Sequence, residues 1–315
     1  MIRRLWLQRF AVSKVLGSAL LAGWLGSGCS ITGYVKNKAA DVVAQSGTTF
    51  SSDDDPELVK SAAPFSLKLM ESLLAENPKH TGLLTATASG FTQYSYAFVQ
   101  AEADEVEPQD FAAAEKLRAR ARKLYLRAQR YGLRGLETKH PGFRTNVLAN
   151  PKSAVKAATK ADVPLLYWTA AAWASAISLS KDNPDLISQI PSMEALIYRA
   201  LELDESYSDG AIHGFLITYE MGRPGAGGDP AARARQHFER AVALSQTNSA
   251  APFVSLAEAV TIQKQDVKEF ESLLNHALAI NPDAVPENRL LNTVMQDRAR
   301  WLLSRKSELF LIEEK

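Results

Sequence analysis

One pattern recurs along the chain and limits what it can fold into. It consists of an alanine, three residues, an aromatic residue, two residues and a second alanine. The two clear copies are Ala121, Tyr125, Ala128 and Ala234, Phe238, Ala241. The small residues let one helix approach another closely, and the aromatic residue fills the gap to the next pair of helices. A chain with this pattern must bury helix against helix.

Two weaker copies extend the pattern toward the C-terminus. They are Met193, Ile197, Ala200 and Phe270, Leu274, Ala277. The closing alanines 128, 200, 241 and 277 are spaced by 72, 41 and 36 residues, near one or two periods of the 34-residue tetratricopeptide repeat. A lone hairpin of this kind cannot bury both faces, so hairpins must stack. We therefore expect an all-α fold, an α-solenoid of divergent tetratricopeptide-like helical hairpins.

Local signals agree with helices throughout. No stretch after Cys29 alternates apolar and polar residues in the way of a half-buried strand. Acidic residues stand before Pro56 and at Asp110, where capping carboxylates favour a helix start. We expect first helices of hairpins over 162–179, 208–222 and 251–263. The acidic run at 102–107 ends an earlier helix, so these residues must face water or a basic partner, and a solvated loop is the default interpretation.

The N-terminus has the layout of a secretory signal. Residues 1–14 carry positive charge, 15–25 form an apolar run too short to span a bilayer, and small residues precede Cys29. This segment resembles the lipobox of bacterial lipoproteins, although Gly26 stands where the box usually has a branched apolar residue. An ordinary secreted protein with a free thiol is the alternative. Ser30 after the cysteine favours the outer membrane, by resemblance to lipoprotein sorting rules.

The chain therefore divides into three predicted parts. Residues 1–28 are a lipoprotein signal peptide, 29–52 are a lipidated N-terminus and tether with Cys29 as the lipidation site, and 53–315 are a single tetratricopeptide-like helical domain. The membrane is then a partner through the lipid anchor, with the body facing the periplasm.

Composition excludes several classes of function. Without residues 1–28 the chain has 32 basic and 35 acidic residues, which argues against a nucleic-acid-binding footprint. A single cysteine excludes a four-cysteine zinc site, and the five histidines are dispersed with no helical zinc pair or nucleophile motif beside them. We expect no metal, no cofactor and no catalysis. The glycine-rich stretch 222–230 lacks the Gly-Lys-Ser or Gly-Lys-Thr ending of a phosphate-binding loop and is interpreted as a turn within a hairpin.

Aromatic residues crowd two of the expected helices. They are typical of hairpin cores, but tyrosine and tryptophan also supply contact area with a polar group in ligand clefts. A ligand or partner cleft is the functional alternative to a plain core. Its candidate residues are Gln93, Tyr94, Tyr96, Phe98, Tyr167, Trp168 and Trp173.

Two long stretches resemble the T-component (TatT) family of tripartite ATP-independent periplasmic (TRAP) transporters. Residues 51–105 contain an acid cluster followed by GFTQYSYAFVQ, and residues 163–310 contain PLLYWTAAAWASAISLS, HFERAVALS and RARWLLSRKSELF. The resemblance implies a periplasm-facing lipoprotein that forms a homotrimer and associates with the periplasmic solute-binding protein, the P-component. A general tetratricopeptide scaffold that grips extended peptides and organises cell-envelope proteins is the alternative function.

Overall fold

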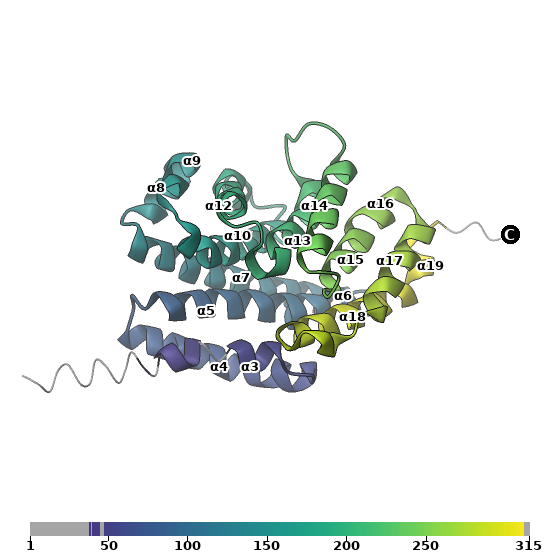
Figure 1. The fold of residues 1–315 in the computed structure, drawn as a ribbon, viewed down its shortest axis with the longest axis horizontal. Coiled ribbons are helices and arrows are strands. Elements are labelled where there is room, and N and C mark those ends of the chain that lie inside the picture. The colour runs from purple at the N-terminus through teal and green to yellow at the C-terminus, as the bar shows by residue number, and fades with distance from the viewer. Residues whose placement is uncertain (1–37, 39, 45–46, 312–315) are drawn as a thin grey trace, which may run out of the picture.

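The computed structural model describes residues 38, 40–44 and 47–311 of the 315-residue chain, and every regular element within these residues is helical. The predicted all-α class is therefore confirmed, with packed helix pairs of the helical-repeat kind (Figure 1). The predicted signal peptide and Cys29 lie outside the described residues. None of the described helices has both the length and the apolar character needed to cross a bilayer.

The N-terminal helices form the lower layer in Figure 1. They are α3 (Gly47–Ser51), α4 (Pro56–Glu76), α5 (Thr81–Tyr94), the π-helix Ser95–Gln100, α6 (Ala101–Val106) and α7 (Phe111–Lys139). Side chains cap their starts as the sequence predicts: Asp55 accepts two backbone N–H bonds at α4, and Asp110 accepts one at α7. α5 packs against both α4 and α7, so these three helices form one stack.

The middle of the chain is centred on α10. Its elements are α8 (Phe143–Ala149), α9 (Pro151–Ala154), α10 (Val163–Ser178), α11 (Pro184–Ile187) and α12 (Ile190–Leu203), with short 3-10 segments at Val155–Ala157 and Lys160–Asp162. α10 packs on α7, α12 and α5. Gly132 makes the α7 contact close: a Cβ there would lie 2.0 Å from the Thr169 Oγ1 atom.

The C-terminal helices continue the array. They are α13 (Tyr207–Gly222), α14 (Pro230–Leu244), α15 (Ala251–Leu256), the π-helix Ala257–Thr261, α16 (Ile262–Lys264), α17 (Val267–Ala279), 3-10 turns at Pro282–Ala284 and Pro286–Asn288, α18 (Arg289–Ser304) and α19 (Lys306–Leu309). α13 packs on α14 and α15, and α17 packs on α15 and α18. The glycine-rich stretch joins α13 to α14, so its interpretation as a turn is confirmed.

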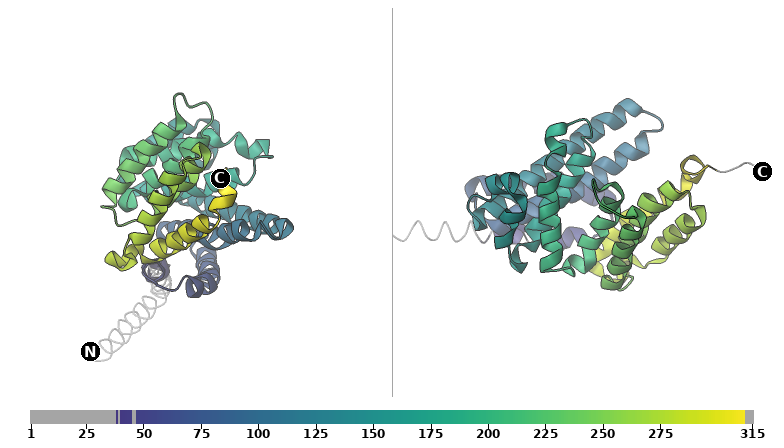
Figure 2. Two further views of the ribbon diagram at one scale, coloured as in Figure 1. Left: turned by 90° about the vertical axis from the view of Figure 1, so that its right-hand side faces the viewer. Right: turned by 90° about the horizontal axis from the view of Figure 1, so that it is seen from above.

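The array curves until its last long helix meets its first ones. α18 contacts α3 and α4, and it runs beside these N-terminal helices when the molecule is seen end-on (Figure 2). Two cations of α18 bond to the N-terminal part of the chain: Arg289 donates to the Ser52 carbonyl oxygen at 3.0 Å, just after α3, and Arg298 pairs with Asp104 of α6 at 3.0 Å. The solenoid therefore folds back on itself and encloses space between its ends.

The alanines of the repeat pattern lie where helices meet. Ala121, Ala128, Ala200, Ala234, Ala241 and Ala277 are all 0–1% exposed. The aromatic positions differ from one another. Tyr125 is fully buried, whereas Phe238 is half-buried between α14 and α15, with its ring centroid 5.3 Å from that of Phe253.

The solvated-loop interpretation of the acidic run is wrong. Residues 102–106 lie in α6, and Asp104 pairs with both Arg118 and Arg298. Glu107 pairs with Arg118 as well, at 2.7 Å. Acidic groups at a helix C-terminus are unfavourable, and here cations brought by distant helices offset that repulsion. Sequence alone could not reveal Arg298 as a partner because it lies almost 200 residues away.

Candidate ligand-binding cavity

A cavity of about 1590 Å³ lies between the two ends of the array. Its walls come from α3, α4, α5, α10, α13, α15 and α18, and most of them are apolar. Leu291, Val294 and Met295 of α18 face it from the C-terminal side, and Val59, Leu67 and Met70 of α4 from the N-terminal side. The volume exceeds the few hundred cubic ångströms of an ordinary small-molecule pocket. The return of α18 to α3 and α4 supplies the C-terminal part of its wall.

Six of the seven predicted cleft residues line this cavity together. They are Gln93, Tyr94, Tyr96, Phe98, Tyr167 and Trp168. Trp173 does not: its side chain is 0% exposed in the core between α10 and α12, and its indole N–H donates to Gln189 Oε1 at 3.0 Å. Trp173 therefore belongs to the packed core, because it lies on the face of α10 that turns away from the cavity.

The π-helix Ser95–Gln100 enlarges the aromatic part of the wall. Three consecutive residues, Tyr96, Ala97 and Phe98, line the cavity, and Gln100 follows them. A wider turn with i→i+5 bonds presents neighbouring side chains to one side, and such turns are frequent at functional sites. The irregular turn thus concentrates aromatic surface at one place.

The hydroxyl groups of Tyr96 and Tyr167 belong to this wall. Neither Tyr96 nor Tyr167 forms a side-chain hydrogen bond with any residue that the structure describes, and Tyr96 is 45% exposed on the cavity wall. Burial, with the negative charge of Glu258, raises the pKa of Tyr96 to about 12. Burial also raises the pKa of Tyr167. Both phenols are therefore protonated at neutral pH and are available as hydrogen-bond donors.

Gln100 and the ring of Tyr207 complete this part of the site. The Tyr125 hydroxyl donates to Gln100 Oε1 at 2.8 Å, so the amide NH₂ of Gln100 remains as donor. The Tyr167 ring lies 4.8 Å from the Trp168 ring and 5.4 Å from the Tyr207 ring, centroid to centroid. The rings of Tyr167, Trp168 and Tyr207 therefore restrain one another, while the Gln100 amide NH₂ stays available as a donor.

Sequence reasoning named Gln93 but missed the hydroxyl-bearing residues that precede it along α5. Thr81, Thr85, Ser89 and Gln93 lie four residues apart and all line the cavity. Thr85 Oγ1 donates to the Thr81 carbonyl at 2.9 Å, and Ser89 Oγ donates to Ala86 at 3.1 Å. These hydroxyls have used their protons and offer only lone pairs to the cavity. The four-residue spacing of small polar residues is the signal that identifies them.

Sequence reasoning also missed a buried carboxylate beside the glycine-rich turn. Glu220 is 2% exposed and accepts bonds from Arg233 at 2.6 Å, Arg223 at 3.2 Å and Tyr198 at 2.7 Å. Burial alone would raise the pKa of Glu220, but these bonds hold it below its ordinary value. Arg233 also donates to the Gly227 carbonyl oxygen, which fixes the turn. This cluster is satisfied internally and is structural.

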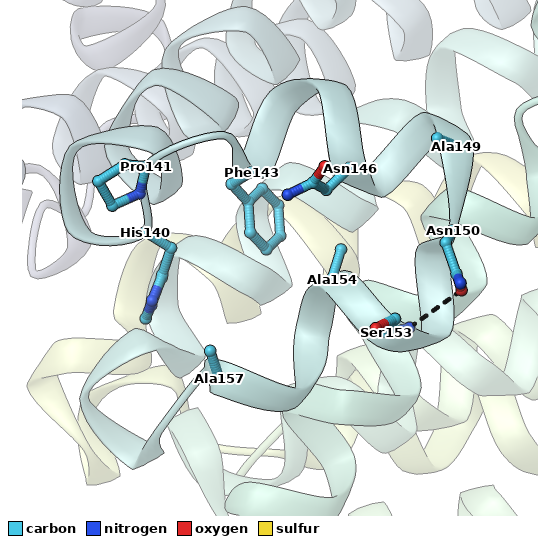
Figure 3. Close-up of a pocket in the computed structure, with 9 residues that line it drawn as sticks. All are labelled: His140, Pro141, Phe143, Asn146, Ala149, Asn150, Ser153, Ala154 and Ala157. Atoms are coloured by element: carbon cyan, nitrogen blue, oxygen red, sulfur yellow. Dashed lines mark hydrogen bonds between the residues drawn. The ribbon is translucent and has the colours of Figure 1, made fainter.

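A second, smaller pocket of about 390 Å³ lies at the end of α7 and along α8 and α9 (Figure 3). Its wall includes His140, Phe143, Asn146 and Asn150, and a hydrogen bond links Asn150 to the Ser153 backbone N–H. None of the predicted cleft residues lines it. Within the described part of the chain, no group of three His, Cys, Asp or Glu side chains is placed to hold a metal ion.

A known protein family matches most of this chain. The family described as TRAP transporter T-component matches residues 52–310, which include every helix from α4 to α19. An uncharacterized protein of Treponema pallidum (strain Nichols) is 33% identical over 266 residues, covering 83% of this chain and 82% of its own length. Most of the cavity-lining residues lie within the residues that the family matches, and Asp41, Ala44, Phe50 and Ser51 precede them. The chain therefore belongs to the TRAP transporter T-component family.

Proposed function

We propose that the protein is the periplasm-facing lipoprotein component of a TRAP transport system and that it receives a small, partly apolar organic ligand in its cavity. The observation that carries this proposal is the cavity itself, with an aromatic wall and unpartnered hydroxyl groups. Family membership associates the chain with a TRAP transport system. The ligand would pass between this protein and the P-component, without chemistry performed by this chain.

The anchor and the assembly belong to the same proposal. Lipidation at Cys29 would hold the body at the outer membrane, because each buried methylene contributes about 0.8 kcal/mol. Residues 30–46 would then connect the anchor to α3. A homotrimer would place three cavities beside one another and give the P-component a composite docking surface.

Purification of the protein from its native membranes tests the proposal. Mass spectrometry of the co-purified material should detect a solute-binding protein of the P-component class and a low-molecular-weight ligand. A variant with Tyr94→Ala and Trp168→Ala should lose the ligand. Arg120→Ala, on α7 and outside the cavity, is the control and should keep it. Recovery of envelope-assembly proteins with no solute-binding protein would favour the peptide-gripping scaffold instead.

A further inference from the structure

The aromatic wall contains hydrogen-bond donors in excess of acceptors. Tyr96 and Tyr167 have protonated hydroxyls with no hydrogen-bond partner in the described part of the chain, and the Gln100 amide NH₂ is available as a donor because Tyr125 occupies the amide oxygen. No acceptor among the described residues bonds to these three donors. A bound molecule that covers this wall would remove water from them, and leaving them unpaired would then be costly, so a molecule that supplies an acceptor is favoured here.

The electrostatic surroundings oppose an anionic acceptor. Asp104 and Glu258 lie near Tyr96 and each raises its pKa. Arg298 is the nearby cation, but it pairs with both carboxylates and does not line the cavity. Asp104 also pairs with Arg118, which pairs with Glu107 and Glu115, so this network contains four carboxylates against two cations. A carboxylate placed beside Tyr96 would meet net negative potential.

Two lysines line the cavity, and neither is placed to neutralise a charge at this wall. Lys139 Nζ donates to the buried Asp162 at 2.8 Å and to the Ala161 carbonyl at 3.1 Å. Lys181 follows the end of α10, whereas Tyr167 lies near its start, with about 16 Å of helix from Tyr167 to Ser178. The remaining charged lining residues, Asp41, Asp209 and Glu287, are acidic.

We propose that the ligand of this cavity is an uncharged, elongated apolar molecule whose single carbonyl, amide or similar neutral acceptor is bound by the hydroxyls of Tyr96 and Tyr167 and the amide of Gln100. This inference rests on the proposed ligand-binding function and adds the chemical class of the ligand. The apolar body lies along the aliphatic walls of α4 and α18. The phenols select for the acceptor, and Asp104 with Glu258 selects against a carboxylate.

A matched series of ten-carbon probes tests the proposal. Decanamide, decanoate and decylamine share a ten-carbon chain, and at pH 7.5 their head groups are a neutral amide, an anionic carboxylate and a cationic ammonium without an acceptor. Each is titrated into the purified full-length protein in phospholipid nanodiscs, with tryptophan fluorescence and calorimetry as readouts. Decanamide should bind at least about tenfold more tightly than decanoate or decylamine.

Conservative variants assign the acceptor contact to its residues. Tyr96→Phe and Tyr167→Phe keep the ring and remove only the hydroxyl, and each should weaken decanamide binding by about 3- to 10-fold. Tyr131→Phe is the matched control, because Tyr131 lies outside the cavity and donates to Glu71. It should leave binding unchanged.

The outcomes distinguish a failure of the neutral-acceptor proposal from a failure of the proposed ligand-binding function. Decanoate or decylamine binding as tightly as decanamide, or tyrosine variants without effect, would overturn the neutral-acceptor assignment while leaving the cavity a ligand site. No binding of any of the three probes to folded protein would overturn both.

Discussion

Two tryptophans on α10, five residues apart, show the difference between core and site. Trp173 is fully buried between α10 and α12, and its N–H is bonded to Gln189. Trp168 lies on the other side of the same helix and keeps free surface on the cavity wall. The residue type and the helix are the same. What differs is whether protein or empty space lies opposite.

The same contrast holds for polar groups. Glu220 is deeply buried, and three side chains satisfy its carboxylate. Tyr96 and Tyr167 retain hydroxyls that no described residue satisfies. Satisfied polar groups stabilise the fold, because an unpaired buried group costs free energy. Unsatisfied ones on a cavity wall remain available for hydrogen bonds.

The largest expected effect on stability is for the buried tryptophan of this pair, Trp173. Trp173→Ala should lower the free energy of unfolding by about 3–5 kcal/mol, because it leaves a cavity in a close-packed core and an unpaired Gln189. Trp168→Ala should cost clearly less, since part of its surface already faces a cavity. Urea denaturation followed by circular dichroism measures both. Equal losses for the two variants would contradict the distinction.

The next largest effect on stability is expected for the buried carboxylate of Glu220. Glu220→Ala removes the acceptor shared by Arg233, Arg223 and Tyr198 and should cost about 2–4 kcal/mol of unfolding free energy. Arg233 should then release the turn at Gly227, which limited proteolysis would detect. Glu239→Ala, an exposed residue of the neighbouring helix α14, serves as control and should change stability by less than about 0.5 kcal/mol.

A smaller effect is expected where α7 meets α10. Gly132→Ala places a methyl group against Thr169 and should cost about 1–3 kcal/mol through overpacking. Thr169→Ala removes the nearest atom, so the double variant should recover part of the loss. Thermal unfolding of the two single variants and the double variant gives their coupling energy. Strict additivity of the losses would show that the helices separate instead.

The smallest expected effect is a dependence of the Tm on pH, through two histidines in contact. The Nδ1 atoms of His213 and His237 lie 2.9 Å apart, so one ring donates a hydrogen bond to the other. The two Nδ1 atoms therefore cannot both be protonated in this arrangement. Burial lowers the pKa of His213, and burial with the charge of His213 lowers that of His237, although Glu205 opposes this at His213. Arg240 and Arg223 add positive charge nearby.

The sign of the pH effect follows from these lowered pKa values. The folded protein binds fewer protons than the unfolded chain, so the stabilising contribution is complete above the ordinary histidine pKa of 6.5 and is lost as the pH falls below it. The Tm should therefore decrease by a few degrees between pH 7.5 and pH 5.5. His213→Gln with His237→Gln should flatten this slope. An unchanged slope would contradict the assignment.

Local chemistry explains which elements could be predicted. The start of α7 after Asp110 and the end of α4 at Asn77 depend on capping within a few residues. The alanine positions of the repeat pattern depend on helix spacing alone. Six of seven cleft candidates line one cavity, since aromatic crowding identifies the right two helices.

Trp173 is the cleft candidate that the sequence pattern assigned to the wrong environment. α10 is apolar on nearly all sides, so periodicity could not distinguish the face that meets α12 from the face that meets the cavity. Glu220 and Arg298 were missed for a related reason. Their partners are placed by tertiary packing, and for Arg298 one partner, Asp104, is far away in the chain.

The sequence by itself determined the helical class, the hairpin pattern and the family likeness, because capping, spacing and small-residue contacts act over one or two helical turns. Only the tertiary structure decided that α18 returns to α3 and α4, where its residues complete the wall of the cavity. The curvature of a solenoid is the sum of small rotations between neighbouring hairpins. No single segment encodes that sum, so the enclosed space appears only when all the hairpins are stacked.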